Sequence, residues 1–196
     1  MTAAADVARA HAHLYADATR VLDAYAPAEP AQEELRRAYL TFLASHPDGV
    51  AKAGPPEHLT ASCLVLDRSG TRVLLTLHRR ARRWFQFGGH LEAGDATLRA
   101  AAAREAREES GIAGLEPLPD PVQLDRHVLD GDFARCREHL DVRYAALAPD
   151  GAEPRVSAES LDVRWWPVAD LPPGTAGELS GLVEASRVAL GLLGRG

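Results

Sequence analysis

Residues 88–112 read GGHLEAGDATLRAAAAREAREESGI, and the second half of this stretch predicts an amphipathic helix. At about 100° per residue, three glutamates share one face of that helix with apolar residues. The residues on this face are Leu98, Ala101, Ala102, Glu105, Glu108, Glu109 and Ile112. The face expected to turn toward the protein interior therefore begins apolar, becomes acidic and ends apolar.

Carboxylates that face a protein interior repel one another and are costly to desolvate, so they call for a hard divalent cation, with Mg²⁺ as the first choice. The pattern predicts a metal site that contains Glu105, Glu108 and Glu109. The alternative is a solvated helix face with pairs four residues apart, such as Arg104 and Glu108. That alternative would favour apolar residues at the positions of Glu105 and Glu109.

The ends of the predicted helix fit the same interpretation. Gly88 and Gly89 permit a close backbone approach before the helix, and Asp95 is the expected N-cap. The first N–H groups of the helix would then lie near anionic oxygens. Gly111 suits a left-handed residue that ends the helix.

This stretch resembles the Nudix box, which is usually written as G, five residues, E, seven residues, REUXEEXGU. The second half matches in spacing, as Arg104, Glu105, Ala106, Glu108, Glu109, Gly111 and Ile112. The first half departs from the pattern, because Asp95 replaces the glutamate counted from Gly89 and eight residues separate it from Arg104. This departure bears on the role of Asp95 and leaves the glutamates in place.

The resemblance to Nudix hydrolases implies roles for individual residues. It implies that Glu105 and Glu109 are direct metal ligands, that Glu108 is a ligand directly or through water, and that Arg104 holds a glutamate in place. It further implies that a backbone carbonyl of Gly88 or Gly89 completes the metal site. The general base would come from the box, with Glu105 as the candidate, or from another loop.

The activity implied is Mg²⁺-dependent hydrolysis, with Mn²⁺ as an alternative, of a nucleoside diphosphate linked to another moiety. Mg²⁺ would withdraw charge from the diphosphate and orient a water for attack at phosphorus. Two alternatives remain: a catalytically weak Nudix-fold module that senses a nucleotide, and an enzyme like isopentenyl diphosphate isomerase, which uses a cysteine and a glutamate. The presence of all three box glutamates favours catalysis.

Candidate substrate-binding residues lie in and beyond the box. Gly88, Gly89 and His90 form the loop before the helix. In the later strand REHLDVRYAAL, alternation places His139, Asp141 and Arg143 on one face. This face is expected to line the substrate cavity, and the alternatives are a solvated face or structural pairing.

Composition limits the partners and the compartment. The formal charge of −6 and the absence of a dense basic run argue against a nucleic-acid polymer as partner. No signal peptide or membrane span is expected, and two cysteines, Cys63 and Cys136, are too few for a disulfide framework. We therefore expect a cytoplasmic protein that acts on a small molecule. The single lysine among many arginines favours a bacterial source.

The chain divides by composition into a helical segment with a linker, residues 1–56, and the Nudix hydrolase domain, residues 57–196. Strand-like runs are expected at residues 58–66, 71–77, 84–87, 122–129, 139–147 and 163–167, followed by a closing helix. The predicted fold is α+β, an α/β/α sandwich of the Nudix type with a mixed sheet, preceded by a helical hairpin. The hairpin has three alternative roles: to cover the core, to form the surface of a homodimer, or to close over substrate.

Overall fold

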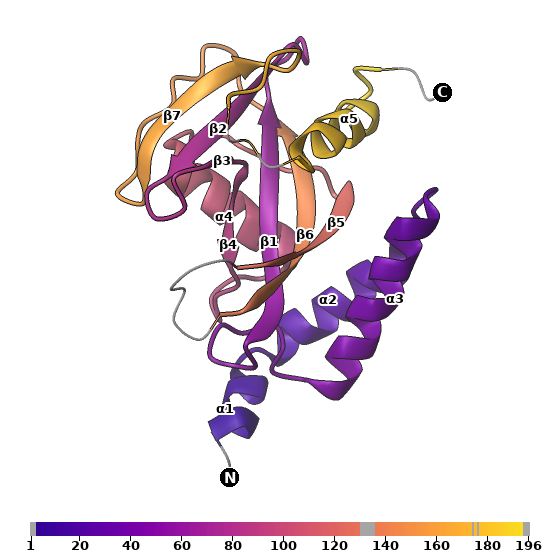
Figure 1. Cartoon of the computed structure of the whole chain (residues 1–196). Coiled ribbons are helices and arrows are strands. Elements are labelled where there is room, and N and C mark those ends of the chain that lie inside the picture. The colour runs from indigo at the N-terminus through magenta and orange to yellow at the C-terminus, as the bar shows by residue number, and fades with distance from the viewer. Residues whose placement is uncertain (1–2, 130–135, 174, 176, 194–196) are drawn as a thin grey trace. The chain divides into compact units, whose positions relative to one another are not determined.

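The structure is a computed structural model that describes residues 3–129, 136–173, 175 and 177–193. Helices at the amino terminus are followed by strands, the helix α4, further strands and a closing helix, in the order expected (Figure 1). The helices are α1 (Ala3–Ala10), α2 (Ala12–Ala24), α3 (Pro30–Ser45), α4 (Leu98–Ser110) and α5 (Leu179–Ala189). The strands are β1 (Glu57–Leu66), β2 (Arg72–His78), β3 (Trp84–Phe85), β4 (Phe87–His90), β5 (Gln123–Val128), β6 (Glu138–Leu147) and β7 (Ser160–Pro167).

The seven strands form one mixed sheet with the order β3-β2-β1-β6-β5, in which β4 also pairs with β1 and β7 with β2. Antiparallel registers include Val65 opposite Leu74 in β1 and β2, and Asp125 opposite Asp141 in β5 and β6. The α+β fold class with an extra amino-terminal helical segment is confirmed. No helix in the described part of the chain combines the length and apolar composition needed to cross a membrane.

The chain divides into two compact units. The first consists of Met1–Ala61, Gly89–Ala101 and Gln123–Arg143, and the second of Ser62–Gly88, Ala102–Val122 and Tyr144–Gly196. The amino-terminal helices therefore group with parts of the later chain, and β1, α4 and β6 each contribute to both units.

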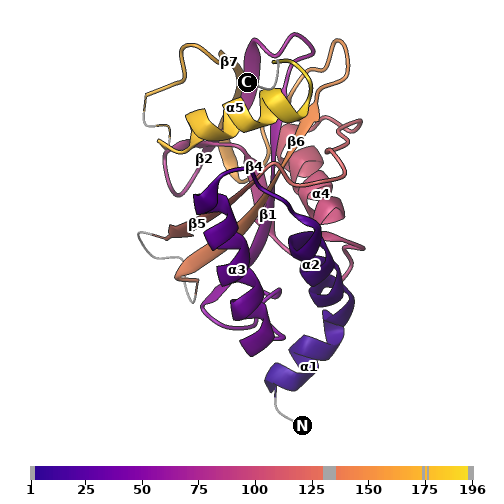
Figure 2. The ribbon, with the colours of Figure 1, turned by 90° about the vertical axis from the view of Figure 1, so that its right-hand side faces the viewer.

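In the first unit, α2 and α3 lie side by side in the two views of Figure 1 and Figure 2. The side chains of Leu14, Leu22 and Tyr39 on these helices are fully buried. The side chain of Gln32 donates to the carbonyl of Leu124 and accepts from its N–H, at 2.9 and 2.7 Å. These bonds satisfy backbone groups of β5, which ends the strand order. The hairpin thus covers part of the core, the first of its three expected roles.

The second unit has its own apolar core between α5 and the strands. Val73 and Leu75 of β2 are fully buried there, together with Leu182 of α5. Trp84 and Trp166 add an edge-to-face aromatic contact with ring centroids 5.2 Å apart. Because Leu64 and Leu66 of β1 join this cluster, their neighbours on the alternate face of β1 turn away from α5.

Helix α4 corrects two expectations. Its N-cap is Thr97, whose Oγ1 accepts from the N–H of Ala100 at 3.0 Å, rather than Asp95. The carboxylate of Asp95 turns back within the longer loop and accepts from the N–H of Glu92 at 2.8 Å. Ala103 is not among the residues of the predicted inward face, yet it is only 5% exposed, so the helix buries a wider face than expected. The predicted left-handed residue after the helix is present, with φ of +71° at Gly111.

Candidate active site

The three box glutamates project from α4 in the second unit and differ in exposure. The whole residue Glu109 is 9% exposed, whereas the Glu105 and Glu108 side chains are 15% and 61% exposed. The helix therefore turns Glu109 inward, leaves Glu105 at the boundary and turns Glu108 to the surface. Burial of Glu109 agrees with the predicted acidic face, whereas Glu108 lies at the edge of that face.

One arginine forms hydrogen bonds with two of the three glutamates. Arg104 Nη1 donates to Glu105 Oε1 at 3.0 Å and to Glu108 Oε2 at 3.3 Å. Glu109 receives a longer hydrogen bond, from the backbone N–H of Gly88 to Oε1, at 3.4 Å. Within the described part of the chain, Glu109 has no ion pair with a basic side chain. Of the three box glutamates, the most buried one is thus the one without a basic partner in this part of the chain.

The pKa values of the two inner glutamates reflect this imbalance. Burial first, and the charge of Glu105 second, raise the pKa of Glu109 to about 8, against the opposing effect of the Gly88 N–H. Burial also raises the pKa of Glu105, although Arg104 acts in the opposite direction. The ionised forms of these two buried carboxylates are unfavourable without a partner. A divalent cation would stabilise the ionised forms, and carboxylate oxygens are suitable ligands for it.

Glu159 is a fourth carboxylate at this site, and sequence reasoning missed it. It lies in the turn before β7, is exposed, and its charge raises the pKa of both Glu105 and Glu109. Arg79 holds this turn: its N–H donates to the Glu159 carbonyl at 3.0 Å, and its Nη2 to the Ser160 carbonyl at 2.9 Å. The local sequence around Glu159 does not resemble a motif. The turn comes near the box glutamates through the pairing of β7 with β2, which spacing along the chain does not predict.

The donor set fits a hard divalent cation. Glu105 and Glu109 lie on adjacent turns of α4, Glu108 stands one residue from Glu109, and Glu159 is near enough for its charge to act on both inner glutamates. Carboxylate oxygens are the ligands preferred by Mg²⁺, which keeps several waters and needs only one or two such groups. The residues present could therefore hold Mg²⁺ or Mn²⁺ without further side chains.

The predicted substrate-binding residues after Gly88 lie in the first unit. Gly89 and His90 end β4, and His139 lies near the start of β6. Burial is the main cause that lowers the pKa of His90 to about 3 and that of His139 to about 4. Both imidazoles are therefore neutral near pH 7, and neither supplies positive charge for a phosphate.

Asp141 and Arg143 are engaged in a buried network rather than lying free on a cavity wall. The Arg143 side chain is 3% exposed, and its guanidinium contacts Asp125 Oδ2 at 2.8 Å, Asp141 Oδ2 at 3.2 Å and Gln123 Oε1 at 2.9 Å. Thr60 Oγ1 donates to Asp141 Oδ1 at 3.1 Å. This arrangement corresponds to the structural-pairing alternative, since these polar groups satisfy one another between β5 and β6.

Comparison with known proteins tests the resemblance independently. The family model of the NUDIX domain matches residues 56–184, which is well over half of the chain. The chain belongs to the Nudix family. A comparison with curated proteins finds no match.

Solved structures support the assignment of a Nudix hydrolase. A hydrolase of the NUDIX family from Clostridium perfringens is 25% identical, with a TM-score of 0.53, and the match covers 70% of this chain and 98% of that one. An Ap4A hydrolase from C. elegans shares 18% identity with a TM-score of 0.56, over 69% and 98% of the two chains. The dihydroneopterin triphosphate pyrophosphohydrolase of E. coli shares 18% identity, with a TM-score of 0.55, over 67% and 94%. The last two likenesses concern the fold alone.

The expected enzyme class, a Nudix hydrolase that acts on diphosphate bonds, is thereby confirmed. The isomerase alternative requires a cysteine that can exchange a proton. Cys63 does not suit that role, because it is fully buried and burial raises its pKa to about 12. Cys136 is half-buried and lies among histidines of the first unit.

Proposed function

We propose that this Nudix protein hydrolyses, with Mg²⁺, a nucleoside diphosphate linked to another moiety. Mn²⁺ is an alternative metal. The bound ion would withdraw negative charge from the diphosphate oxygens, which otherwise repel a nucleophile. The products would be a nucleoside monophosphate, or a similar phosphate, and the other phosphorylated fragment.

We propose different roles for the box residues according to their surroundings. Glu105 and Glu109 would hold the metal directly, and the exposed Glu108 would do so directly or through a water. Arg104 would act as a positioning residue, because its guanidinium already bonds both Glu105 and Glu108. A carbonyl of Gly88 or Gly89 is proposed as a further ligand.

The observation that carries this proposal is the state of Glu109. Its carboxylate is buried, is repelled by Glu105 and Glu159, and, among the residues that the structure describes, accepts only a long hydrogen bond from Gly88. A purely structural glutamate at a buried helix position would be expected to have a basic partner. A divalent cation bound by Glu109 would supply the missing charge.

Two carboxylates are candidates for the general base. Glu105 is bonded by Arg104, which opposes the rise of its pKa and ties up one of its oxygens. Glu159 is exposed and stands in a turn held by Arg79, so its oxygens can reach a water at the edge of the acidic site. We assign the proton acceptor to Glu159 and keep Glu105 as the alternative.

The substrate is tested first with a panel: dNTPs, NTPs, ADP-ribose, NADH, nucleotide sugars and dinucleoside polyphosphates, each with Mg²⁺, Mn²⁺ or EDTA. We expect one preferred, EDTA-sensitive substrate. Hydrolysis in ¹⁸O-labelled water then identifies the attacked phosphorus, because the label appears in the fragment that received the water. Nucleotide binding without turnover by any member of the panel would instead support the sensing module.

The metal assignment is tested by Glu109→Gln, which keeps the shape of the side chain and removes its charge. We expect turnover to fall by about 10³-fold or more, with unchanged circular dichroism. The matched control is Glu34→Gln, an exposed position on α3, which should leave turnover unchanged. Full activity in a folded Glu109→Gln protein would contradict the proposed site.

A further inference from the structure

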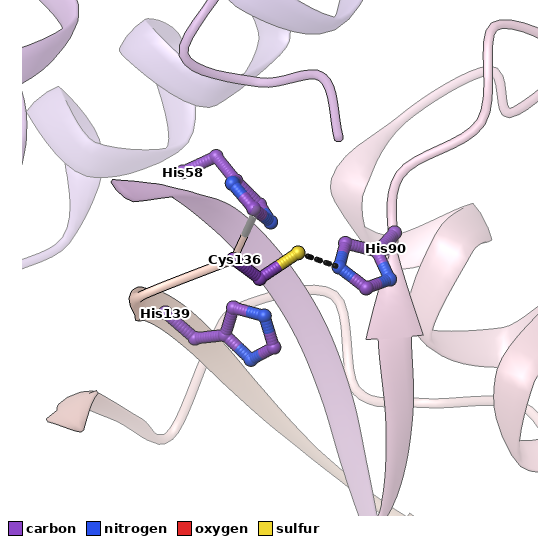
Figure 3. A group of neighbouring side chains, drawn as sticks. All are labelled: His58, His90, Cys136 and His139. Atoms are coloured by element: carbon purple, nitrogen blue, oxygen red, sulfur yellow. Dashed lines mark hydrogen bonds between the residues drawn. The ribbon is translucent and has the colours of Figure 1, made fainter. Parts of the chain in front are cut away.

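Three histidines and a cysteine converge in the first unit, away from the box glutamates in the sequence. His58 lies at the start of β1, His90 at the end of β4 and His139 near the start of β6, and Cys136 lies two residues before β6. One donor atom of each lies within 4.8 Å of the donor atoms of all the others. Figure 3 shows the four side chains turned toward one another, with the sulfur of Cys136 beside the ring of His90.

The spacing of the rings matches what a tetrahedral ion imposes. The ring centroids of His58, His90 and His139 are 5.1, 5.2 and 5.1 Å apart, a nearly equilateral triangle. If one nitrogen of each imidazole bound a tetrahedral ion at 2.0–2.1 Å, the centroids of the imidazole rings would lie about 5.2 Å apart.

The sulfur completes the same geometry. Cys136 Sγ lies 3.7 Å from His90 Nε2, and the edge between sulfur and nitrogen around a tetrahedral Zn²⁺ is about 3.6 Å. The widest separation of donor atoms, 4.8 Å, exceeds such an edge by roughly 1 Å. Small rotations of the half-buried rings of His90 and His139 would bring the donors together.

Two ring nitrogens in the cluster are buried without a partner. Among the residues that the structure describes, His58 Nε2 and His139 Nε2 have no hydrogen bond. Such atoms are rare in native proteins and call for a bound water or ion. His58 is fully buried, so its unpaired nitrogen is especially costly.

The backbone prepares His58 for metal binding. Its Nδ1–H donates to the carbonyl of Pro55 at 3.1 Å, and a carbonyl can only accept, so Nε2 carries the lone pair. Histidine ligands commonly have this arrangement, in which the second ring nitrogen is fixed by a carbonyl or carboxylate. The acceptor nitrogen of His58 therefore faces the cluster already in the form that binds a cation.

The donor set indicates which metal would bind. Three imidazole nitrogens and a thiolate suit Zn²⁺, whereas Mg²⁺ prefers oxygen donors, which this set lacks. Four protein ligands leave no open position for a substrate or water, which is typical of structural zinc. The pair formed by Cys136 and His139 also has two intervening residues, a short spacing that recurs in zinc sites.

We propose that His58, His90, Cys136 and His139 form a structural Zn²⁺ site that joins the start of β1, the end of β4 and the beginning of β6. This site shares no side chain with the proposed Mg²⁺ site: its four ligands belong to the first unit and all the box glutamates to the second. It also reassigns His90 and His139, which the sequence suggested as substrate contacts.

The proposal is tested with the full chain after removal of metals by chelation. Zn²⁺ is titrated against a chromophoric competitor, and Co²⁺ is then used as a spectroscopic probe. We expect one Zn²⁺ per chain with a Kd well below micromolar, and a Co²⁺ spectrum with a sulfur charge-transfer band and tetrahedral visible bands. Excess Mg²⁺ should leave both signals unchanged.

Variants locate the site. Cys136→Ser and His139→Ala should weaken Zn²⁺ binding at least 100-fold, and Cys136→Ser should abolish the charge-transfer band. Both positions are only partly buried, and circular dichroism reports whether the variants fold. The matched controls are Cys63→Ala, which removes the other thiol, and His46→Gln, an exposed histidine. Both controls should retain binding.

Several results would overturn the proposal. They are the absence of stoichiometric Zn²⁺ binding by the wild-type chain, binding that survives in both Cys136→Ser and His139→Ala, and binding that Glu109→Gln removes. A reactive thiol would give a different result: Cys136 would then be alkylated equally fast with and without Zn²⁺, whereas a zinc ligand is protected by the ion.

Discussion

Asp17 of α2 accepts a hydrogen bond from the backbone N–H of Leu98, the first residue of α4, at 2.8 Å. The first N–H groups of a helix lack partners within the helix and carry partial positive charge, so a carboxylate there is stabilising. His13, also on α2, bonds the carbonyl of Asp95 through Nε2 at 2.8 Å. The amino-terminal segment therefore supports the start of the helix that carries the box glutamates.

Replacing Asp17 should weaken the fold through this contact. We expect Asp17→Ala to lower the free energy of unfolding by about 1–2 kcal/mol, because the Leu98 N–H loses its acceptor and the helix loses a favourable charge. Asp23→Ala, an exposed position on the same helix, should change it by less than about 0.5 kcal/mol. Urea unfolding measures both variants, and equal losses would show that the contact contributes nothing.

Gly111→Ala should destabilise the end of α4 for two reasons, the left-handed backbone and a steric clash. A control variant distinguishes the two. Gly111 has φ of +71°, and a Cβ there would lie 2.8 Å from the Cβ of Arg155. Gly151 has nearly the same φ, +70°, with no atom within 4 Å of a built Cβ. Both alanine variants should lose about 1 kcal/mol from the left-handed backbone, and Gly111→Ala should lose more from the clash. Thermal unfolding of the two variants should differ, and matching midpoints would contradict the clash.

Asp67 should make stability depend on pH in the acid range. Partial burial acts to raise its pKa, but hydrogen bonds from Arg72, Ser69 and Thr71 outweigh this effect and lower the pKa. A carboxylate with a lower pKa in the folded state stabilises the fold fully above its unfolded pKa, which is about 3.9. That stabilisation is lost as the pH falls through the folded pKa. Asp67→Asn should therefore be less stable than wild type at pH 7, and the difference should shrink below about pH 4. A constant difference in urea unfolding across this range would exclude the effect.

Arg143 provides a test of whether its network is structural. Arg143→Met should cost about 3–5 kcal/mol, because it leaves the buried Asp141 and the partly buried Asp125 without their shared guanidinium. Arg126 is the matched control: its side chain is 49% exposed and pairs with Glu138 on the same two strands. Arg126→Met should cost less than about 1 kcal/mol. If Arg143→Met keeps wild-type stability but loses substrate affinity, Arg143 would instead be a substrate contact.

Glu159→Gln tests the proposed general base. Turnover should fall by about 10²-fold or more, because the amide cannot accept the proton of the attacking water. The acid limb of the pH dependence of kcat should disappear with it, which loss of a purely structural contact would not cause. Glu153→Gln, an exposed glutamate earlier in the same connection, is the control and should behave as wild type. An unchanged rate for Glu159→Gln would return the role to Glu105.

Much of the fold follows from local patterns in the sequence. Strands occur at all six expected runs, although the run at residues 84–87 is divided into β3 and β4. These runs could be predicted because alternation and flanking turn residues depend on neighbours along the chain. Local patterns were less reliable at boundaries. The first arm of the expected helical hairpin is broken between Ala10 and Ala12 into α1 and α2. Thr97 replaces Asp95 as the cap of α4, because the extra residue lets the Asp95 carboxylate bond its own loop.

The sequence likewise determined only part of the candidate sites. The spacing along one helix by itself determined that Glu105, Glu108 and Glu109 occur together, since residues three or four apart on a helix are neighbours. Only the tertiary structure decided that Glu109 is the buried member, that Glu159 joins it, and that three histidines meet Cys136. Those contacts join residues tens of positions apart, and strand pairing in the folded sheet, rather than spacing along the chain, brings them within reach.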